Sequence, residues 1–149
     1  SYVPPKHRCA YAGEVKGIKF VNDSKGTNVA ATLTAMSSLP GSKVIILGGQ
    51  GKGEDYAPLA VGAAKYTKYA VVIGSEKDKI ASALSLAGYN SFIKVDNMDE
   101  AVETAYLNAS EGDTVLLSPA CTSWDMYPNY GARGDHFVKA AKKIIERES

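Results

Sequence analysis

Long hydrophobic runs are absent from this sequence of 149 residues. The longest, such as 44–47 and 70–73, have the length of a strand, whereas a membrane span needs about 20 apolar residues. Charge of one sign is also lacking, because 17 basic and 16 acidic residues leave a formal net charge of +1. The composition therefore argues against binding to nucleic acid or to a membrane through bulk charge, and we expect neither as a partner.

Cysteine and histidine are scarce. Cys9 and Cys121 lie far apart, and neither belongs to a C-x-x-C pair. His7 and His136 do not have the spacing of zinc ligands. The sequence thus excludes a disulfide framework, predicts no metal site and fits a reducing cytosol.

The opening segment has neither an initiator methionine nor the pattern of a signal peptide. Residues 1–5 are polar and Pro-rich, which is typical of a linker. The length is that of one domain, large enough to bury roughly 68–70% of its extended surface. We expect residues 1–6 to be the remnant of a linker and 7–149 to be a domain from a longer protein.

Short apolar runs alternate with helical periodicities along the chain. Four β-branched-rich runs predict buried parallel strands: 44–47, 70–73, 92–95 and 115–117. Helical spacing of apolar residues predicts helices over 29–39, 80–87, 98–109 and 137–145. Segments 11–15 and 18–22 flank Lys16-Gly17 and predict a hairpin. We therefore expect a Rossmann-like α/β fold, in which a mostly parallel sheet of about six strands, one antiparallel near the N-terminus, has helices on both faces.

Three polar loops follow strands of this predicted sheet, at 23–28, 48–55 and 118–134. In open α/β sheets, ligands bind outside the carboxyl ends of the strands. These loops are therefore the candidate site.

The first loop is a corner between a strand and a helix, where free N–H groups and the positive helix end favour anions. It also carries the Asp23 carboxylate, the Lys25 ammonium and the hydroxyls of Ser24 and Thr27. This mixture suits a nucleotide phosphate or an acidic substrate. Simple capping of the helix is the alternative, but it leaves Lys25 unexplained.

The second loop is rich in glycine around Lys52. It is not a Walker A motif, because Gly53 stands where Ser or Thr is needed, and its pattern for dinucleotide binding is weak. Two interpretations stay open. The segment is either a flexible turn or a loop whose glycines let the backbone approach a ligand while Lys52 offers a cation.

The third loop combines small hydroxyl residues with aromatic residues, which suits a pocket with a few placed polar groups. Cys121 has no neighbouring histidine in the sequence, so we interpret it as a small buried residue and not as a nucleophile. Arg133 and Asp135 are predicted to pair with each other or to cap the last helix.

His7-Arg8 lies ahead of the first strand. One interpretation is an exposed basic pair near the end of the chain. The other is that Arg8 reaches a phosphate or a base held by a neighbouring domain.

Together these segments resemble the C-terminal domain of the Mur ligases, and among them the members that add D-glutamate. The resemblance rests on the order and spacing of 7–8, 23–29, 47–52, 117–123 and 133–135. The chain departs from the family pattern at Ala10 (usually Glu), Trp124 (more often Leu or Phe) and Tyr130 (usually Phe). It also has no Walker A sequence.

The resemblance implies an ATP-dependent ligase of the bacterial cytoplasm that acts in peptidoglycan precursor synthesis. The family reaction joins D-glutamate to UDP-N-acetylmuramoyl-L-alanine through an acyl phosphate, with ATP and Mg²⁺ as requirements of the full-length enzyme. The uridine-binding and ATPase domains would be missing here. We therefore expect this domain to be monomeric, to bind neither ATP nor Mg²⁺ tightly by itself, and to be inactive alone.

The resemblance also implies residue roles. D-glutamate would contact Thr27, Lys52, Ser123, Trp124 and Tyr130. The nucleotide would contact Arg8, Asp23 and Lys25, of which Lys25 would be catalytic, and no residue would bind a metal.

Two other functions remain open from the sequence. The glycine-rich turn after a strand is compatible with a free-standing Rossmann-like nucleotide-binding module. A non-catalytic domain that docks to a partner through its loops is the second.

Overall fold

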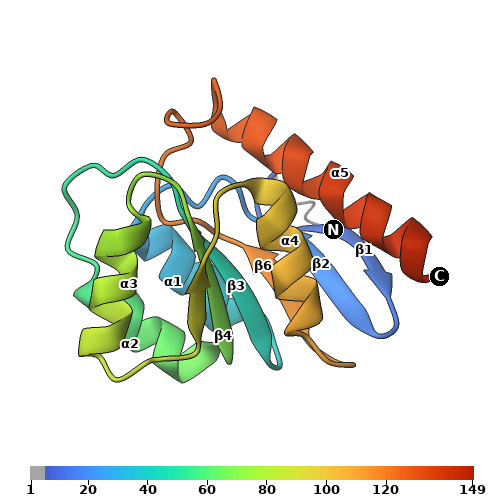
Figure 1. Ribbon diagram of the computed structural model, residues 1–149, viewed down its shortest axis with the longest axis horizontal. Helices are drawn as coiled ribbons and strands as arrows, with labels where there is room; N and C mark the ends of the chain where they lie inside the picture. The colour runs from blue at the N-terminus through green and yellow to red at the C-terminus, as the bar shows by residue number, and fades with distance from the viewer. Residues whose placement is uncertain (1–5) are drawn as a thin grey trace.

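The computed structural model describes residues 6–149, so most of the expected linker remnant lies outside the described residues. Its centre is a six-stranded sheet with the order β1-β2-β6-β3-β4-β5 (Figure 1). The strands are β1 (Ala10–Val15), β2 (Ile18–Asn22), β3 (Lys43–Gly48), β4 (Tyr69–Ile73), β5 (Phe92–Lys94) and β6 (Thr114–Leu117). β1 pairs with β2 in antiparallel fashion and every other pair is parallel, which confirms the predicted sheet.

Five helices cover the sheet on its two faces. They are α1 (Val29–Ser38), α2 (Ala57–Tyr66), α3 (Lys77–Leu86), α4 (Met98–Leu107) and α5 (Tyr130–Glu148). α4 and α5 pack on one face, and α1, α2 and α3 on the other (Figure 1). The result is the predicted α/β fold of three layers, with α2 as a helix that the periodicity did not indicate.

The core is split by the sheet into two apolar layers. β3 is buried along its whole length, and its residues alternate between the layers. Val44 and Ile46 face the layer under α4 and α5, whereas Ile45 and Leu47 face the layer under α1, α2 and α3. This alternation follows from the period of two in a strand, and burial on both faces explains the continuous apolar run.

Three helices begin at an asparagine. The Oδ1 atoms of Asn28, Asn97 and Asn129 accept hydrogen bonds from backbone N–H groups three residues further on, at 2.8, 2.9 and 2.8 Å. Each asparagine has an extended backbone, as an N-cap requires. The capping interpretation of the first loop is thus correct for Asn28, and the residues before it are left for other tasks.

The edge strand β5 differs from the prediction. It ends at Lys94, although the Val95 N–H still donates to Val72 O at 3.0 Å. Ile93 is 41% exposed, because only β4 pairs with this strand. The apolar run therefore predicted the strand and its direction but not its place at the edge.

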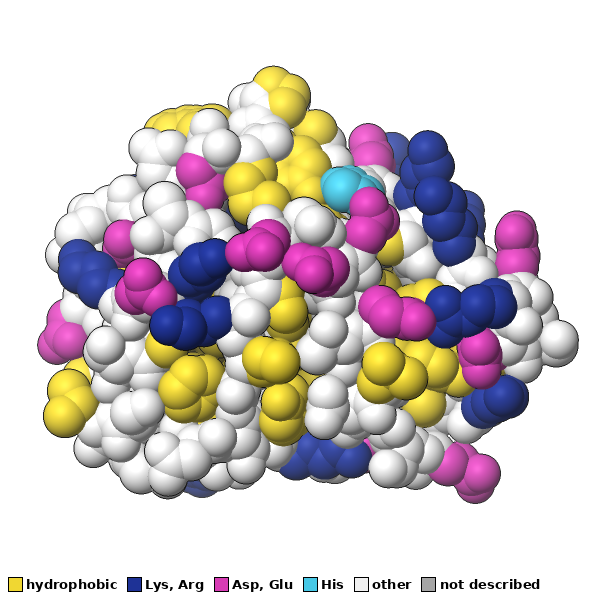
Figure 2. Space-filling view, viewed as in Figure 1, with side chains coloured by type: hydrophobic (Ala, Val, Ile, Leu, Met, Phe, Trp, Pro, Cys, Tyr) yellow, Lys and Arg dark blue, Asp and Glu magenta, His cyan; other side chains and the backbone are white. Residues whose placement is uncertain are grey.

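The surface carries charges of both signs. Figure 2 shows acidic and basic side chains interspersed on the face that α4 and α5 cover, with basic side chains gathered over α5. On α5 these include the exposed Lys139, Lys142 and Lys143. None of the helices within 6–149 is long and apolar enough to span a membrane.

Candidate functional site

The three polar loops meet at one end of the sheet, because β2, β6 and β3 are neighbours in it (Figure 1). The Ala120 N–H donates to Gly26 O at 2.9 Å and joins the third loop to the first. The Gln50 and Thr122 backbones exchange hydrogen bonds of 2.9 and 3.0 Å, which join the second loop to the third. The convergence expected from the parallel topology is confirmed.

A cavity of about 270 Å³, which we call the Lys52 cavity, lies between these loops. It is lined by Thr27, Lys52, Thr122, Ser123, Trp124 and Tyr130. All five residues that the resemblance assigned to D-glutamate are among them, drawn from the three loops and the start of α5. The structure thus brings together residues that lie up to 103 positions apart in the sequence.

The polar groups of the Lys52 cavity have unused hydrogen-bonding capacity. Within residues 6–149, the Thr27 and Ser123 hydroxyls and the Lys52 ammonium make no hydrogen bond or ion pair. Trp124 is 66% exposed and Tyr130 37% exposed, so two aromatic side chains stand at the mouth. A cation with two free hydroxyls beside an aromatic wall suits a small anionic ligand.

A second cavity, of about 300 Å³, is also lined in part by the first loop, and we call it the Asp23 cavity. Its lining comprises Arg8, Cys9, Asp23, Lys25, Gly26, Ala31, Thr34 and Ala35. The three residues assigned to the nucleotide all belong to it. The Lys25 ammonium lies 6.0 Å from the centre of the ring of Tyr130, which lines the Lys52 cavity.

Asp23 is held firmly in its cavity wall. Its Oδ2 accepts from the Ser118 hydroxyl at 2.7 Å, and its Oδ1 accepts from the Cys9 N–H at 3.1 Å. Burial raises the pKa of this carboxyl, and the Ser118 and Cys9 hydrogen bonds and the nearby Arg8 oppose that rise only in part.

The prediction for Arg133 is wrong. This residue neither pairs with Asp135 nor caps α5, since Asn129 is the cap. Its guanidinium is buried, donating to Ser24 Oγ at 2.9 Å, to Ser24 O at 2.7 Å and to Cys121 O at 2.9 Å. Burial lowers the pKa of Arg133 to about 10, so it stays charged at neutral pH and holds the first and third loops together.

His7 is also not the exposed residue of the first interpretation. It is buried, and the Asn22 side-chain amide donates to His7 Nδ1 at 2.8 Å. His7 Nε2 lies 3.5 Å from Asp135 Oδ1, the partner that Arg133 does not take. The Lys25 N–H donates to His7 O at 3.0 Å, so the segment that carries Arg8 is joined to the first loop at Lys25. The Arg8 side chain itself is exposed.

The glycines ahead of Lys52 serve the packing of their own loop. A Cβ on Gly49 would lie 2.4 Å from Thr122 O, and one on Gly51 would lie 2.0 Å from Glu76 Oε1. A side chain at either position would collide with the neighbouring loop or with Glu76, which explains these glycines without a ligand.

Cys121 is buried, and its Sγ lies 3.3 Å from the Tyr56 hydroxyl. Burial raises the pKa of its thiol to about 11, so the sulfur is neutral at physiological pH. The interpretation of Cys121 as a packed residue is confirmed. Neither cysteine forms a disulfide.

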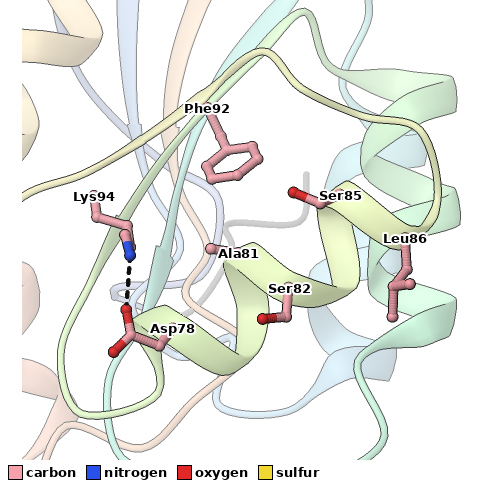
Figure 3. A pocket seen from close by; sticks show the side chains of 7 residues that line it. All are labelled: Asp78, Ala81, Ser82, Ser85, Leu86, Phe92 and Lys94. Atoms are coloured by element: carbon pink, nitrogen blue, oxygen red, sulfur yellow. Dashed lines mark hydrogen bonds and ion pairs between the residues drawn. The ribbon is translucent and has the colours of Figure 1, made fainter.

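A hollow of about 760 Å³, larger than either of these cavities, lies elsewhere, between α3 and the edge strand β5. Figure 3 shows Phe92 and Leu86 along it and the ion pair of Lys94 Nζ with Asp78 Oδ1, 2.9 Å apart. Asp78 and Lys94 are the charged residues that line the hollow, and they neutralise each other. The hollow itself is open to solvent. The candidate site is therefore the loop end of the sheet.

Metal ligands are not clustered in the part of the chain that is described. Residues 6–149 contain no group of three or more His, Cys, Asp or Glu side chains that could hold a metal ion. These residues do not fit a Mg²⁺ site of their own.

The family model for the Mur ligase, glutamate ligase domain matches residues 7–121. The chain belongs to this Mur ligase family. It is 42% identical, over 141 residues, to the UDP-N-acetylmuramoylalanine–D-glutamate ligase of Nitrosococcus oceani. That alignment covers 93% of this chain and 31% of the relative, so the chain spans about a third of its length.

Solved structures of several ligases share the fold. A murein peptide ligase from Psychrobacter arcticus superposes with a TM-score of 0.64 at 14% identity, over 91% of this chain and 30% of that one. The folylpolyglutamate synthase/dihydrofolate synthase of Yersinia pestis, complexed with AMPPNP and Mn, superposes with a TM-score of 0.62 at 13% identity. That superposition covers 91% of this chain and 31% of the other. At these identities the likeness establishes the fold alone.

Several residues of this Mur ligase domain that shape the site were missed from the sequence. Thr122 lines the Lys52 cavity, and Ser75, Glu76 and Asp125 hold its loops. The Ser75 N–H donates to Asp125 Oδ2 at 2.9 Å, and its hydroxyl donates to Gly49 O at 3.1 Å. Polar residues directly after β4, at the same end of the sheet as the three loops, were the available signal.

The raised pKa of Asp23 predicts a pH dependence of stability. The folded carboxyl titrates above the unfolded value of about 3.9, so its charge lowers stability at neutral pH and this cost disappears as pH falls below that value. Asp23→Asn should thus melt at a higher temperature than the unaltered chain at pH 7, with the gap closing towards pH 4. Melting curves from pH 4 to 7 measure this, and a gap that widens on acidification would contradict it.

Proposed function

We propose that this chain is the D-glutamate-binding, C-terminal domain of an ATP-dependent ligase that joins D-glutamate to UDP-N-acetylmuramoyl-L-alanine in peptidoglycan precursor synthesis. The observation that carries the proposal is the Lys52 cavity, where one ammonium and two free hydroxyls from three loops converge. The 42% identity to a D-glutamate ligase supports the same substrate.

In this proposal Lys52, Thr27 and Ser123 bind the two carboxylates of D-glutamate. An ammonium supplies a point charge, and the hydroxyls donate in fixed directions. Trp124 and Tyr130 form the wall that excludes water around the amino acid. Because these groups come from three different loops, they contact the ligand from several sides, hold it in one orientation and present its amine to the reacting carbonyl.

The Asp23 cavity is proposed to receive the nucleotide. Arg8 and Lys25 provide positive charge for phosphate oxygens, and the Asp23 carboxylate accepts hydrogen bonds from hydroxyl groups. Lys25 is the proposed catalytic residue, because it lines the Asp23 cavity, lies near Tyr130 of the Lys52 cavity, and carries a cation that can stabilise negative charge developing in the reaction.

ATP supplies the phosphoryl group that activates the acceptor carboxylate. Its metal would be held outside residues 6–149, which lack a suitable cluster. We further propose residues 7–149 as the domain boundary, a monomeric state, a bacterial cytoplasmic location, and uridine-binding and ATPase domains in the rest of the protein. Under this proposal the domain alone has no turnover.

A ligation assay tests the proposal. The intact protein, given UDP-N-acetylmuramoyl-L-alanine and ATP, should form product with D-glutamate and none with L-alanine or a diamino acid. The 149-residue chain alone should form none with any of them. Efficient ligation by the pure chain would refute its role as a binding domain, and tight binding of NAD by that chain would favour the nucleotide-binding module.

A further inference from the structure

The loop that carries Lys52 is anchored at its two ends. On one side, the Thr122 N–H donates to Gln50 O at 3.0 Å and the Gln50 N–H donates to Thr122 O at 2.9 Å. On the other side, the buried Tyr56 donates its hydroxyl proton to Glu76 Oε1 at 2.9 Å. Lys52 lies in the stretch between these anchors.

That stretch, residues 51–54, is held by a single hydrogen bond among the described residues. The Val29 N–H donates to Glu54 Oε1 at 3.1 Å. Gly53 has a φ of +82°, and a Cβ built on it would have no atom within 4 Å, so packing does not restrain it. On the side beyond Gly51, the Glu54 hydrogen bond is therefore the polar contact that ties Lys52 to another element.

The start of α1 is suited to hold this carboxylate. Asn28 caps the helix through the Ala31 N–H, which leaves the Val29 N–H without a partner inside the helix. The first turn of α1 contains no acidic residue of its own. Glu54 supplies both the missing acceptor and a negative charge at the positive end of the helix.

We propose that Glu54 is a positioning residue that keeps Lys52 opposite Thr27. Glu54 follows Lys52 by two residues, and Val29 follows Thr27 by two residues, so the hydrogen bond ties together the two sides of the Lys52 cavity. Glu54 is not among the residues that line the cavity, so it acts through Lys52 and not on the ligand. The proposal rests on the proposed function, since it assumes that Lys52 binds a carboxylate of D-glutamate.

The opposite role would be competition, in which the Glu54 carboxylate occupies the place of the ligand. Its position outside the cavity wall argues against that role. The two roles predict opposite changes in D-glutamate affinity when Glu54 is replaced. Removing a competitor strengthens binding, whereas removing a positioning residue weakens it.

The test compares ¹⁵N-labelled forms of the 149-residue chain by NMR. Glu54→Ala removes the acceptor, Glu54→Gln retains a side-chain oxygen in the same place, and Glu146→Ala is the control for charge on exposed α5. Backbone relaxation at residues 51–54 reports loop order, and titration with D-glutamate reports affinity. In the intact ligase, steady-state kinetics of the same variants shows whether KM for D-glutamate changes while kcat does not.

We expect Glu54→Ala to lose order at 51–54 and to raise Kd and KM for D-glutamate about tenfold, the equivalent of one charge-assisted hydrogen bond, with kcat little changed. Glu54→Gln should stay within about threefold of the unaltered chain, since a neutral hydrogen bond remains. Unchanged loop order, unchanged affinity or tighter binding in Glu54→Ala would overturn the positioning role alone. The proposed function would be overturned as well if the unaltered chain did not bind D-glutamate and the intact ligase did not use it.

Discussion

Lys52→Ala is expected to raise the D-glutamate concentration that the intact ligase requires by about tenfold to a hundredfold. Lys52 is the only cation that lines its cavity within residues 6–149, and losing one charge-assisted hydrogen bond costs roughly 1.5–3 kcal/mol. The KM for ATP should change little, because Lys52 does not line the Asp23 cavity. Steady-state kinetics with each substrate varied in turn measures both values.

Two variants control this prediction. Lys139→Ala removes an exposed lysine that forms no ion pair among the described residues, and it should leave the kinetics unchanged. Lys52→Arg retains the charge and should recover part of the affinity, although the planar group fits the cavity differently. An unchanged D-glutamate dependence in Lys52→Ala would refute the assignment of this residue.

Arg133→Met is expected to lower the free energy of unfolding by about 3–5 kcal/mol. The substitution removes three hydrogen bonds of a buried guanidinium and leaves Ser24 O and Cys121 O in the interior with no donor from this residue. At this chain length the loss corresponds to a melting temperature about 10 °C lower or more. Thermal and urea unfolding of the 149-residue chain measure it.

The matched control is Arg147→Met on the same helix. Arg147 likewise makes several contacts through its guanidinium, but these are ion pairs with Glu103 and Glu148 at the surface. Such exposed ion pairs add little to stability. Its melting temperature should stay close to that of the unaltered chain. Arg133→Lys should fall between the two, because an ammonium cannot reach both loops as the guanidinium does. Equal effects of Arg133→Met and Arg147→Met would contradict the structural role of Arg133.

Much of the fold could be predicted because its central strands are buried on both faces. The continuous apolar runs at 44–47, 70–73 and 115–117 coincide with β3, β4 and β6. α2 escaped prediction because alanine and glycine dominate it and blur the helical period. Its Gly62 permits close packing, since a Cβ there would lie 2.3 Å from Leu33 Cδ2.

The site was predictable where chemistry is local and unpredictable where it depends on distant partners. The loops containing Lys25, Thr27 and Lys52 follow strands directly, so their meeting at one end of the sheet followed from topology. The contact of Glu54 with α1 joins segments that no spacing connects. Arg133 did leave a signal, because it occupies the core stripe of α5 four residues before the buried Phe137. A charged residue on such a stripe needs buried partners.

The most direct test of the account is an NMR titration of the labelled chain with D-glutamate and, separately, with L-glutamate. A preformed pocket predicts saturable shifts of the Thr27, Lys52 and Ser123 amides with D-glutamate and no matching response to L-glutamate. An absence of shifts at these residues, or an equal response to both enantiomers, would contradict the claim that this domain carries a stereoselective D-glutamate pocket.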